Sequence, residues 1–238
     1  GERAAEDRKV EGSNPSRGIF MIKENILLKL SYADSFTILN GVFGLLSIFF
    51  ILQGDSHVAF IFILLAVLAD GMDGIMARKY GGFLGRYMDE FSDIVSFCVA
   101  PCIFAYHTYE IGFDVIFFAS SSIFLIFGML HLINYHISKQ DFFVGVTTPA
   151  AAIIVISLAF LNFPLYTIIA AFIVLAILMI SPLPYPRIER HFAIVACIII
   201  FSAMSGIKEF VLLLLIATIL YTIFGPVYMK TKSSKMSL

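Results

Sequence analysis

Residues 68–97, LADGMDGIMARKYGGFLGRYMDEFSDIVSF, decide the fold, because they place four aspartates and a pair of adjacent glycines between two apolar segments. Asp70 and Asp73 are three residues apart, and Asp89 and Asp93 are four apart, so each pair shares one face of a helix. The glycine pair predicts a short turn between the two helices. We therefore expect two antiparallel helices whose acidic pairs face each other.

The composition of the whole chain is that of a membrane protein. Of its 238 residues, 60% are hydrophobic and 14% are charged, with a mean hydropathy of +0.94. Soluble domains are about 45–50% apolar and about 25% charged. These values exclude a water-soluble globular domain, a disordered chain and a nucleic-acid-binding domain. The three cysteines have the spacing of neither a disulfide framework nor a zinc site. We predict an all-α, polytopic transmembrane helix bundle.

About eight spans are expected, because a helix needs about 20 apolar residues to cross a hydrocarbon core of about 30 Å. They cover residues 35–53, 57–77, 90–106, 113–136, 144–161, 164–181, 191–205 and 209–228. These spans form one transmembrane domain at 35–228. Before it we predict a polar tail at 1–20, native or added, and a short amphipathic juxtamembrane helix within 21–34 that lies on the membrane surface. A cytoplasmic tail follows at 229–238.

The basic residues orient this bundle. With eight spans and both termini in the cytoplasm, 15 of the 16 Lys and Arg residues fall in cytoplasmic segments, and only Lys208 falls in an outer loop. Short cytoplasmic loops of membrane proteins carry such an excess of positive charge. We therefore expect an integral protein of the cytoplasmic membrane, with the four aspartates of 68–97 at its cytoplasmic edge.

Four converging carboxylates predict a site for divalent cations. A charged side chain at the bilayer centre costs about 2.5–3.5 kcal/mol on insertion scales, and four like charges also repel one another. Hard oxygen ligands favour Mg²⁺, Mn²⁺ or Ca²⁺ over zinc, and two such ions could clamp a diphosphate. The alternative is a solvated loop whose acids pair with Arg78, Lys79 and Arg86. The interleaved glycines and the helical spacing favour the cation site.

Small residues beside the acids leave room for a ligand. Gly74 and Ala77 follow Asp70 by four and seven positions, on the same helical face. Arg78 can pair with a phosphate oxygen in bidentate fashion, and Gly85 makes space on the opposing helix. The stretch therefore has the residues needed to bind a phosphorylated ligand.

The pattern D-x-x-D-G-x-x-A-R, six residues, G-x-x-x-D-x-x-x-D resembles the signature of the CDP-alcohol phosphatidyltransferase family. The resemblance implies that Asp70, Asp73, Asp89 and Asp93 hold two divalent ions, Mg²⁺ or Mn²⁺, which bind the diphosphate of a CDP-linked lipid. It implies that Asp93 is the general base that activates the attacking hydroxyl, and that CMP leaves. The residues implied to border the CDP are Asn40, Asp70, Gly74, Ala77, Arg78 and Gly85.

Further segments resemble the membrane-embedded phosphatidylserine synthases within this family. They are DSFTILNGVFGLL at 34–46, SDIVSFCVAPCIFA at 92–105, FFVGVTTPAAA at 142–152 and MISPLPYPR at 179–187. Together they extend over most of the chain. They imply L-serine as the acceptor, CDP-diacylglycerol or CDP-archaeol as the donor, membrane lipids as surroundings and a homodimer.

The acceptor site departs from this subfamily, which often has R-L-A-R-F-N where this chain has HLINYH at 131–136. Both arginines are replaced. The candidate acceptor-binding residues are His131, Asn134, Lys139, Thr148 and Arg187. The same chemistry with inositol phosphate or glycerol phosphate is the alternative.

A small-molecule transporter is the alternative from a different functional class. Transporters typically carry acidic residues at the bilayer midplane, interrupted helices and inverted repeats. In this chain the acids are expected at the cytoplasmic edge, and the second half contains no repeat of the pattern. The sequence therefore favours an enzyme of phospholipid synthesis.

Overall fold

A computed structural model describes residues 30–80, 85–137, 143–186 and 190–236. The predicted tail at 1–20 lies outside the described residues, and so does most of the predicted amphipathic segment. Of that segment, Tyr32–Asp34 already belong to the first described helix.

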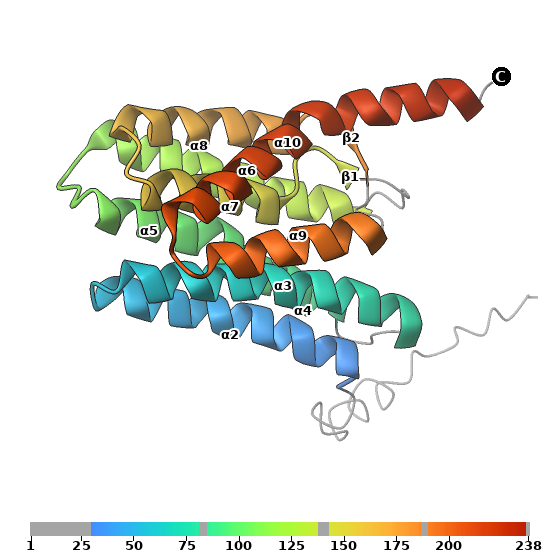
Figure 1. The fold of residues 1–238 in the computed structure, drawn as a ribbon, viewed down its shortest axis with the longest axis horizontal. Coiled ribbons are helices and arrows are strands. Elements are labelled where there is room, and N and C mark those ends of the chain that lie inside the picture. Colours follow the sequence, from blue (N-terminus) through green and yellow to red (C-terminus); the bar gives the residue numbers. More distant parts are fainter. Residues whose placement is uncertain (1–29, 81–84, 138–142, 187–189, 237–238) are drawn as a thin grey trace, which may run out of the picture.

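The described residues form helices and one small sheet (Figure 1). The elements in chain order are α2 (Tyr32–Leu52), α3 (Ser56–Tyr80), α4 (Gly85–Asp93), η3 (Ile94–Val99), α5 (Ala100–Thr108), α6 (Val115–Ile137), β1 (Phe143–Val144), α7 (Thr148–Phe160), α8 (Leu165–Met179), β2 (Pro184–Tyr185), α9 (Arg190–Ala203) and α10 (Lys208–Met236). The π-helix η3 joins α4 to α5 without a break. The described residues thus form eight helical rods, in the order of the eight expected spans.

Four stretches are long and apolar enough to cross a membrane: Tyr32–Leu52, Ser56–Met76, Val115–Asn134 and Lys208–Thr231. This finding confirms the all-α membrane class. The helix α7, with 13 residues, is shorter, and at 1.5 Å per residue it spans about 20 Å. Nearly all its residues are buried and apolar, as expected for a helix at the centre of a bundle.

The helices run between two ends of the bundle (Figure 1). The paired helices α2 and α3 lie along one side, and α6 pairs with α8 on another, while α7 contacts α3, α5, α8 and α10 between them. At one end lie the start of α2, the end of α3 and the strands β1 and β2. At the other end lie the connections from α2 to α3 and from α5 to α6.

The strands β1 and β2 lie at the end of the bundle where α2 starts (Figure 1). They pair antiparallel, with Phe143 opposite Tyr185. Gly145 follows at a φ of 86°, and a Cβ there would lie 2.0 Å from the carbonyl oxygen of Met179. Only glycine fits this position. For this reason the helix that we predict at 144–161 begins later, at Thr148.

Helix α10 continues beyond its predicted end at 228 and reaches Met236. Pro226 lies inside it, and because proline has no N–H, the carbonyl of Thr222 loses its helical partner. The Tyr185 hydroxyl donates a hydrogen bond of 3.0 Å to this carbonyl. Residues 229–236 contain neither glycine nor proline, so the helix extends into the segment that we predict as a tail.

Candidate active site

The four aspartates of 68–97 converge between the last part of α3 and helix α4. Asp70 and Asp73 belong to the last part of α3, and Asp89 and Asp93 belong to α4. One carboxylate oxygen from each of Asp70, Asp89 and Asp93 lies within 4.8 Å of the other two. The structure therefore brings together acidic residues that are up to 23 positions apart in the sequence.

The remaining acid, Asp73, lies next to Asp89 of this cluster. Its side chain is 8% exposed. The Thr37 hydroxyl of α2 donates a hydrogen bond of 2.5 Å to Asp73 Oδ2. The site is thus built from three helices, and α2 contributes hydrogen-bond donors together with the buried Asp34, which lies close enough to Asp73 to repel it.

Asp93 is bonded in the same way. The Asn40 Nδ2 amide donates a 2.8 Å hydrogen bond to Asp93 Oδ1, and both side chains are buried. The sequence implies that Asn40 borders the CDP. The structure places its amide against the carboxylate of Asp93.

Glycines let α2 approach the acidic helix closely. A Cβ on Gly44 would lie 2.3 Å from Ser96 Oγ, and one on Gly41 would lie 3.0 Å from Ser92 Oγ. The two serine hydroxyls donate 2.9 Å hydrogen bonds to backbone carbonyls of α2. Small residues permit such close packing between membrane helices.

The helix changes its winding directly after Asp93. Residues Ile94–Val99 form a π-helix, and the Ala100 N–H bonds to the carbonyl of Val95. Pro101 follows, which supplies no N–H to the preceding turn. Short π-helical segments occur frequently at functional sites. Here the segment carries Ser96, one of the hydroxyls that bond to α2.

The donor set fits a hard divalent cation. Carboxylate oxygens bind Mg²⁺ at about 2.0–2.1 Å and Ca²⁺ at about 2.3–2.6 Å, so oxygens within 4.8 Å of one another can share an ion. Asp89 Oδ1 is buried without a hydrogen-bond partner. Such an orphaned, negatively charged acceptor calls for a cation or a donor. The residues therefore match the predicted cation site.

The other residues expected to border the CDP lie next to the acids in the chain. Gly74 is half-buried in α3, and beside Asp70 a Cβ on Gly71 would meet no atom within 4 Å. Ala77 and Arg78 belong to the last turn of α3, and Gly85 begins α4. The side chains of Ala77 and Arg78 lie outside what the structure describes.

Three of the five expected acceptor residues belong to the described part of the chain. His131 is buried, and its Nδ1 lies 2.7 Å from the carbonyl oxygen of Met179. Thr148 is buried at the start of α7, whereas Asn134 is exposed. Among the described residues, no hydrogen bond joins these three side chains to the carboxylates. Lys139 and Arg187 lie outside the described residues.

Sequence reasoning missed the hydroxyl groups around the acids, namely those of Thr37, Ser92 and Ser96. A signal for the first was present. The buried face of α2 contains Asp34, Thr37, Asn40, Gly44 and Ser47, at helical spacings of three and four. A buried polar stripe on an otherwise apolar helix indicates that the helix faces a polar partner.

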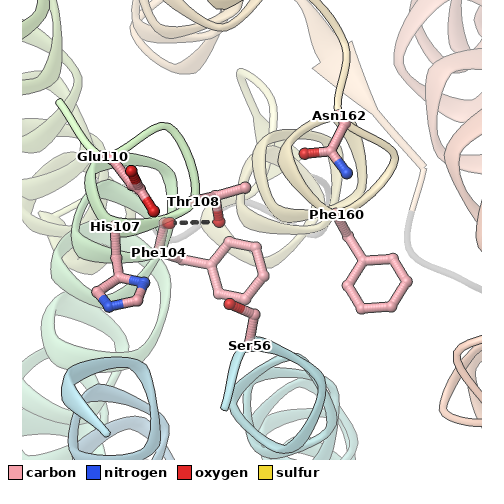
Figure 2. Close-up of a pocket in the computed structure, with 7 residues that line it drawn as sticks. All are labelled: Ser56, Phe104, His107, Thr108, Glu110, Phe160 and Asn162. Carbon is pink, nitrogen blue, oxygen red and sulfur yellow. Dashed lines mark hydrogen bonds between the residues drawn. The ribbon is translucent and has the colours of Figure 1, made fainter. Parts of the chain in front are cut away.

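A separate cavity of about 290 Å³ opens at the other end of the bundle (Figure 2). Its lining residues are Ser56, Phe104, His107, Thr108, Glu110, Phe160 and Asn162. Ser56 begins α3, whereas Asp70 lies 14 residues further along the same helix, a separation of about 21 Å. This cavity is therefore distinct from the carboxylate site.

Taken together, the fold and the site define a membrane-embedded helical protein with a cluster of carboxylates suited to divalent cations. Residues 30–183 match the family model of the CDP-alcohol phosphatidyltransferases. The chain belongs to this family, as residues 68–97 predict, and it is a transferase of phospholipid synthesis.

Curated relatives point to one branch of the family. The chain is 32% identical over 200 residues to a CDP-diacylglycerol–serine O-phosphatidyltransferase of Methanocaldococcus jannaschii, covering 82% of this chain and 92% of that protein. It is 36% identical to the archaetidylserine synthase of Methanothermobacter thermautotrophicus, over 67% of this chain and 71% of the relative. A CDP-diacylglycerol–serine O-phosphatidyltransferase of Bacillus subtilis is 34% identical, over 66% of this chain and 90% of its own length.

Proposed function

We propose that this protein transfers a phosphatidyl or archaetidyl group from a CDP-linked lipid to the hydroxyl of L-serine and releases CMP. The observation that carries the proposal is the convergence of Asp70, Asp89 and Asp93 within 4.8 Å, from two helices. The family membership and the names of the relatives support the reaction class and the acceptor.

Two divalent ions complete the proposed site, Mg²⁺ or Mn²⁺, with Ca²⁺ as a further option. The four acidic residues Asp70, Asp73, Asp89 and Asp93 hold them. When bound, such ions neutralise the charge of a diphosphate and of the phosphoryl group in transfer. The orphaned Oδ1 of Asp89 supports this assignment, because a bound cation would give it a partner.

Asp93 acts as the general base in this proposal. It accepts the proton of the serine hydroxyl while that oxygen forms a bond to the lipid-linked phosphorus, and the bond from this phosphorus to CMP breaks. A positioned base contributes about 10²–10⁴-fold to a rate. Residues that border the CDP are Asn40, Asp70, Gly74, Ala77, Arg78 and Gly85, and the open space at Gly71 supports access along α3.

The proposed acceptor-binding residues come from four separate segments of the chain. Serine brings a carboxylate and an ammonium group, and Lys139 and Arg187 offer positive charges for the carboxylate. Asn134, Thr148 and His131 are the remaining candidates. The contact of His131 Nδ1 with the carbonyl oxygen of Met179 also joins α6 to the end of α8.

We further propose that the eight helical rods cross the cytoplasmic membrane, with both termini and the carboxylates on the cytoplasmic side. The distribution of basic residues supports this orientation. The last part of α3, to which Asp70 and Asp73 belong, runs toward the end of the bundle that carries the start of α2 and the two strands (Figure 1). A homodimer is proposed from the family resemblance alone.

The test supplies purified protein with CDP-diacylglycerol or CDP-archaeol, Mn²⁺ or Mg²⁺, and one acceptor per reaction: serine, inositol phosphate or glycerol phosphate. CMP release is measured. We expect release with serine alone and none after metal removal with EDTA. Release only with a phosphorylated alcohol would overturn the serine assignment, and no release with any acceptor would overturn the reaction.

A further inference from the structure

Helix α2 holds one carboxylate from each of the two acidic helices. Thr37 donates to Asp73 of α3, and Asn40 donates to Asp93 of α4. The two donors are three residues apart and therefore share a face of α2. Both are almost fully buried, at 1% and 0% exposure.

Two serines of the continuous α4–η3 helix bond to the backbone of α2 at the same positions. The Ser92 hydroxyl donates to the backbone carbonyl of Thr37, and the Ser96 hydroxyl donates to the backbone carbonyl of Asn40. The same two residues of α2 thus give side-chain hydrogen bonds to the acids and receive backbone hydrogen bonds next to Asp93. We name Thr37, Asn40, Ser92 and Ser96 the α2 clamp.

We propose that Thr37 and Asn40 are positioning residues that orient Asp73 and Asp93 for cation binding and proton transfer. This inference rests on the proposed function and assigns the α2 clamp a part in it. The terminal torsion of an aspartate is broad, so a carboxylate without a fixed donor samples many orientations. A donor on a packed helix restricts that motion.

Each hydrogen bond also selects one oxygen. Asn40 donates to Asp93 Oδ1 and Thr37 donates to Asp73 Oδ2, so the other oxygen of each carboxylate has no donor from these two residues and is free to accept a proton or bind a cation. The Asn40 Oδ1 atom is buried without a hydrogen-bond partner. The Asn40 side chain therefore bonds to Asp93 through its Nδ2 donor, whereas its Oδ1 acceptor makes no hydrogen bond. Outer partners of this kind typically change metal affinity or activity by about 10–100-fold when mutated.

The first arm of the test uses Thr37, because valine has nearly its shape and lacks its hydroxyl. Mn²⁺ affinity of the purified protein is measured by calorimetry, without donor or acceptor. We expect Thr37→Val to lower the affinity about tenfold and Thr37→Ser to retain it within about threefold. Wild-type affinity in Thr37→Val would overturn the proposal for Asp73.

The second arm uses Asn40→Ala, with Ser47→Ala as the matched control. Ser47 is equally buried on α2, but its hydroxyl bonds to the carbonyl of Gly44 within the helix. We expect Asn40→Ala to lower kcat about 10–100-fold, whereas the loss of a contact to CDP alone would raise the KM for CDP-lipid and leave kcat unchanged. Equal losses of kcat and equal shifts in Tm in both variants would overturn the positioning role and leave a structural one.

The two arms separate this inference from the proposed function. Absence of CMP release by the wild-type protein with serine counts against the function, whereas the Mn²⁺ measurement needs no acceptor. The Thr37 arm decides the proposal by itself if Asn40→Ala does not purify as a folded protein. Normal Mn²⁺ binding in Thr37→Val by an active enzyme counts against the inference alone.

Discussion

The α2–α4 region and the α7–α10 region use buried polar groups in different ways. Between α2 and the acidic helices, the side chains of Thr37 and Asn40 bond to carboxylates of neighbouring helices. In α10, Thr218 bonds to the carbonyl four residues earlier, and Thr222 does the same. Tyr185 bonds to the carbonyl that Pro226 leaves without a partner.

The comparison teaches that polarity inside a membrane protein has two separate uses. In the second region, the hydroxyl groups of Thr218, Thr222 and Tyr185 bond to backbone carbonyls, because polar groups in lipid need a partner within the protein. In the first region, they satisfy acids whose own presence is costly there. The carboxylates are therefore the feature that needs a functional explanation, and α2 is organised around them.

The variant Asp93→Asn is expected to have the largest effect, and it tests whether the carboxylates of the α2–α4 region have a functional role. Loss of the base is expected to lower CMP release about 10²–10⁴-fold, because the carboxamide cannot accept the proton. At saturating Mn²⁺, binding of CDP-lipid should fall far less than CMP release, since the substitution keeps the size of the side chain and three acids of the site remain. Single-turnover CMP release and lipid binding are the measurements. Glu209→Gln, at an exposed acid of α10, is the control, and wild-type activity in Asp93→Asn would remove the base assignment.

The next largest effect is expected for the cation site itself. Asp70→Asn and Asp89→Asn each remove one charge from the oxygen cluster. We expect Mn²⁺ affinity to fall about tenfold or more in each variant, because affinity depends on the number of charged ligands. Calorimetry measures it. Unchanged affinity in both variants, with Glu209→Gln as reference, would contradict a cation site at these residues.

A packing variant tests whether the close approach of α2 is required. Gly44→Ala would place a Cβ 2.3 Å from Ser96 Oγ and 2.8 Å from Ser96 Cα. Overpacking of this kind costs about 1–3 kcal/mol, and we expect activity to fall with it as the α2 clamp opens. Thermal unfolding and CMP release are measured. Gly71→Ala is the stability control, because its Cβ would meet no atom within 4 Å. Equal stability of the two variants would show that the approach is not tight.

The smallest effect is expected in the α7–α10 region. Tyr185→Phe leaves the carbonyl of Thr222 buried without its donor, which costs about 1–3 kcal/mol of the free energy of unfolding. Activity should remain at the wild-type level, because the hydroxyl serves the backbone only. Tyr221→Phe is the comparison, since its hydrogen bond to Pro186 is longer, at 3.3 Å. A large loss of activity in Tyr185→Phe would contradict a purely structural role for buried hydroxyl groups in the α7–α10 region.

Much of the fold was predictable because apolar length is a local property. The eight helical rods follow the expected spans, and the segment at 90–106 lies within the longer run from Gly85 to Thr108. The ends were less predictable. Gly145 delays the start of α7 through its left-handed conformation, and Pro226 lies inside α10 without ending it. Both effects depend on tertiary partners, the carbonyl of Met179 and the hydroxyl of Tyr185.

The candidate site, like the fold, has a part that the sequence predicted and a part that depends on tertiary contacts. The spacing of the four acids predicts that they share helix faces, and the structure brings them together. The acceptor residues could not be placed, because His131, Asn134 and Thr148 come from segments whose mutual arrangement no local pattern describes. His131 bonds to Met179, which is 48 positions away in the chain.

The sequence by itself determined the membrane class, the family and the acidic residues, because each depends on composition or on spacing within one or two helices. The tertiary structure alone decided which neighbours hold these acids. Whether Thr37 and Asn40 face Asp73 and Asp93 depends on the rotation and closeness of α2 against α3 and α4. That rotation results from contacts at Gly41 and Gly44 with Ser92 and Ser96, more than 50 residues away, and helical periodicity describes each helix but not the angle between them.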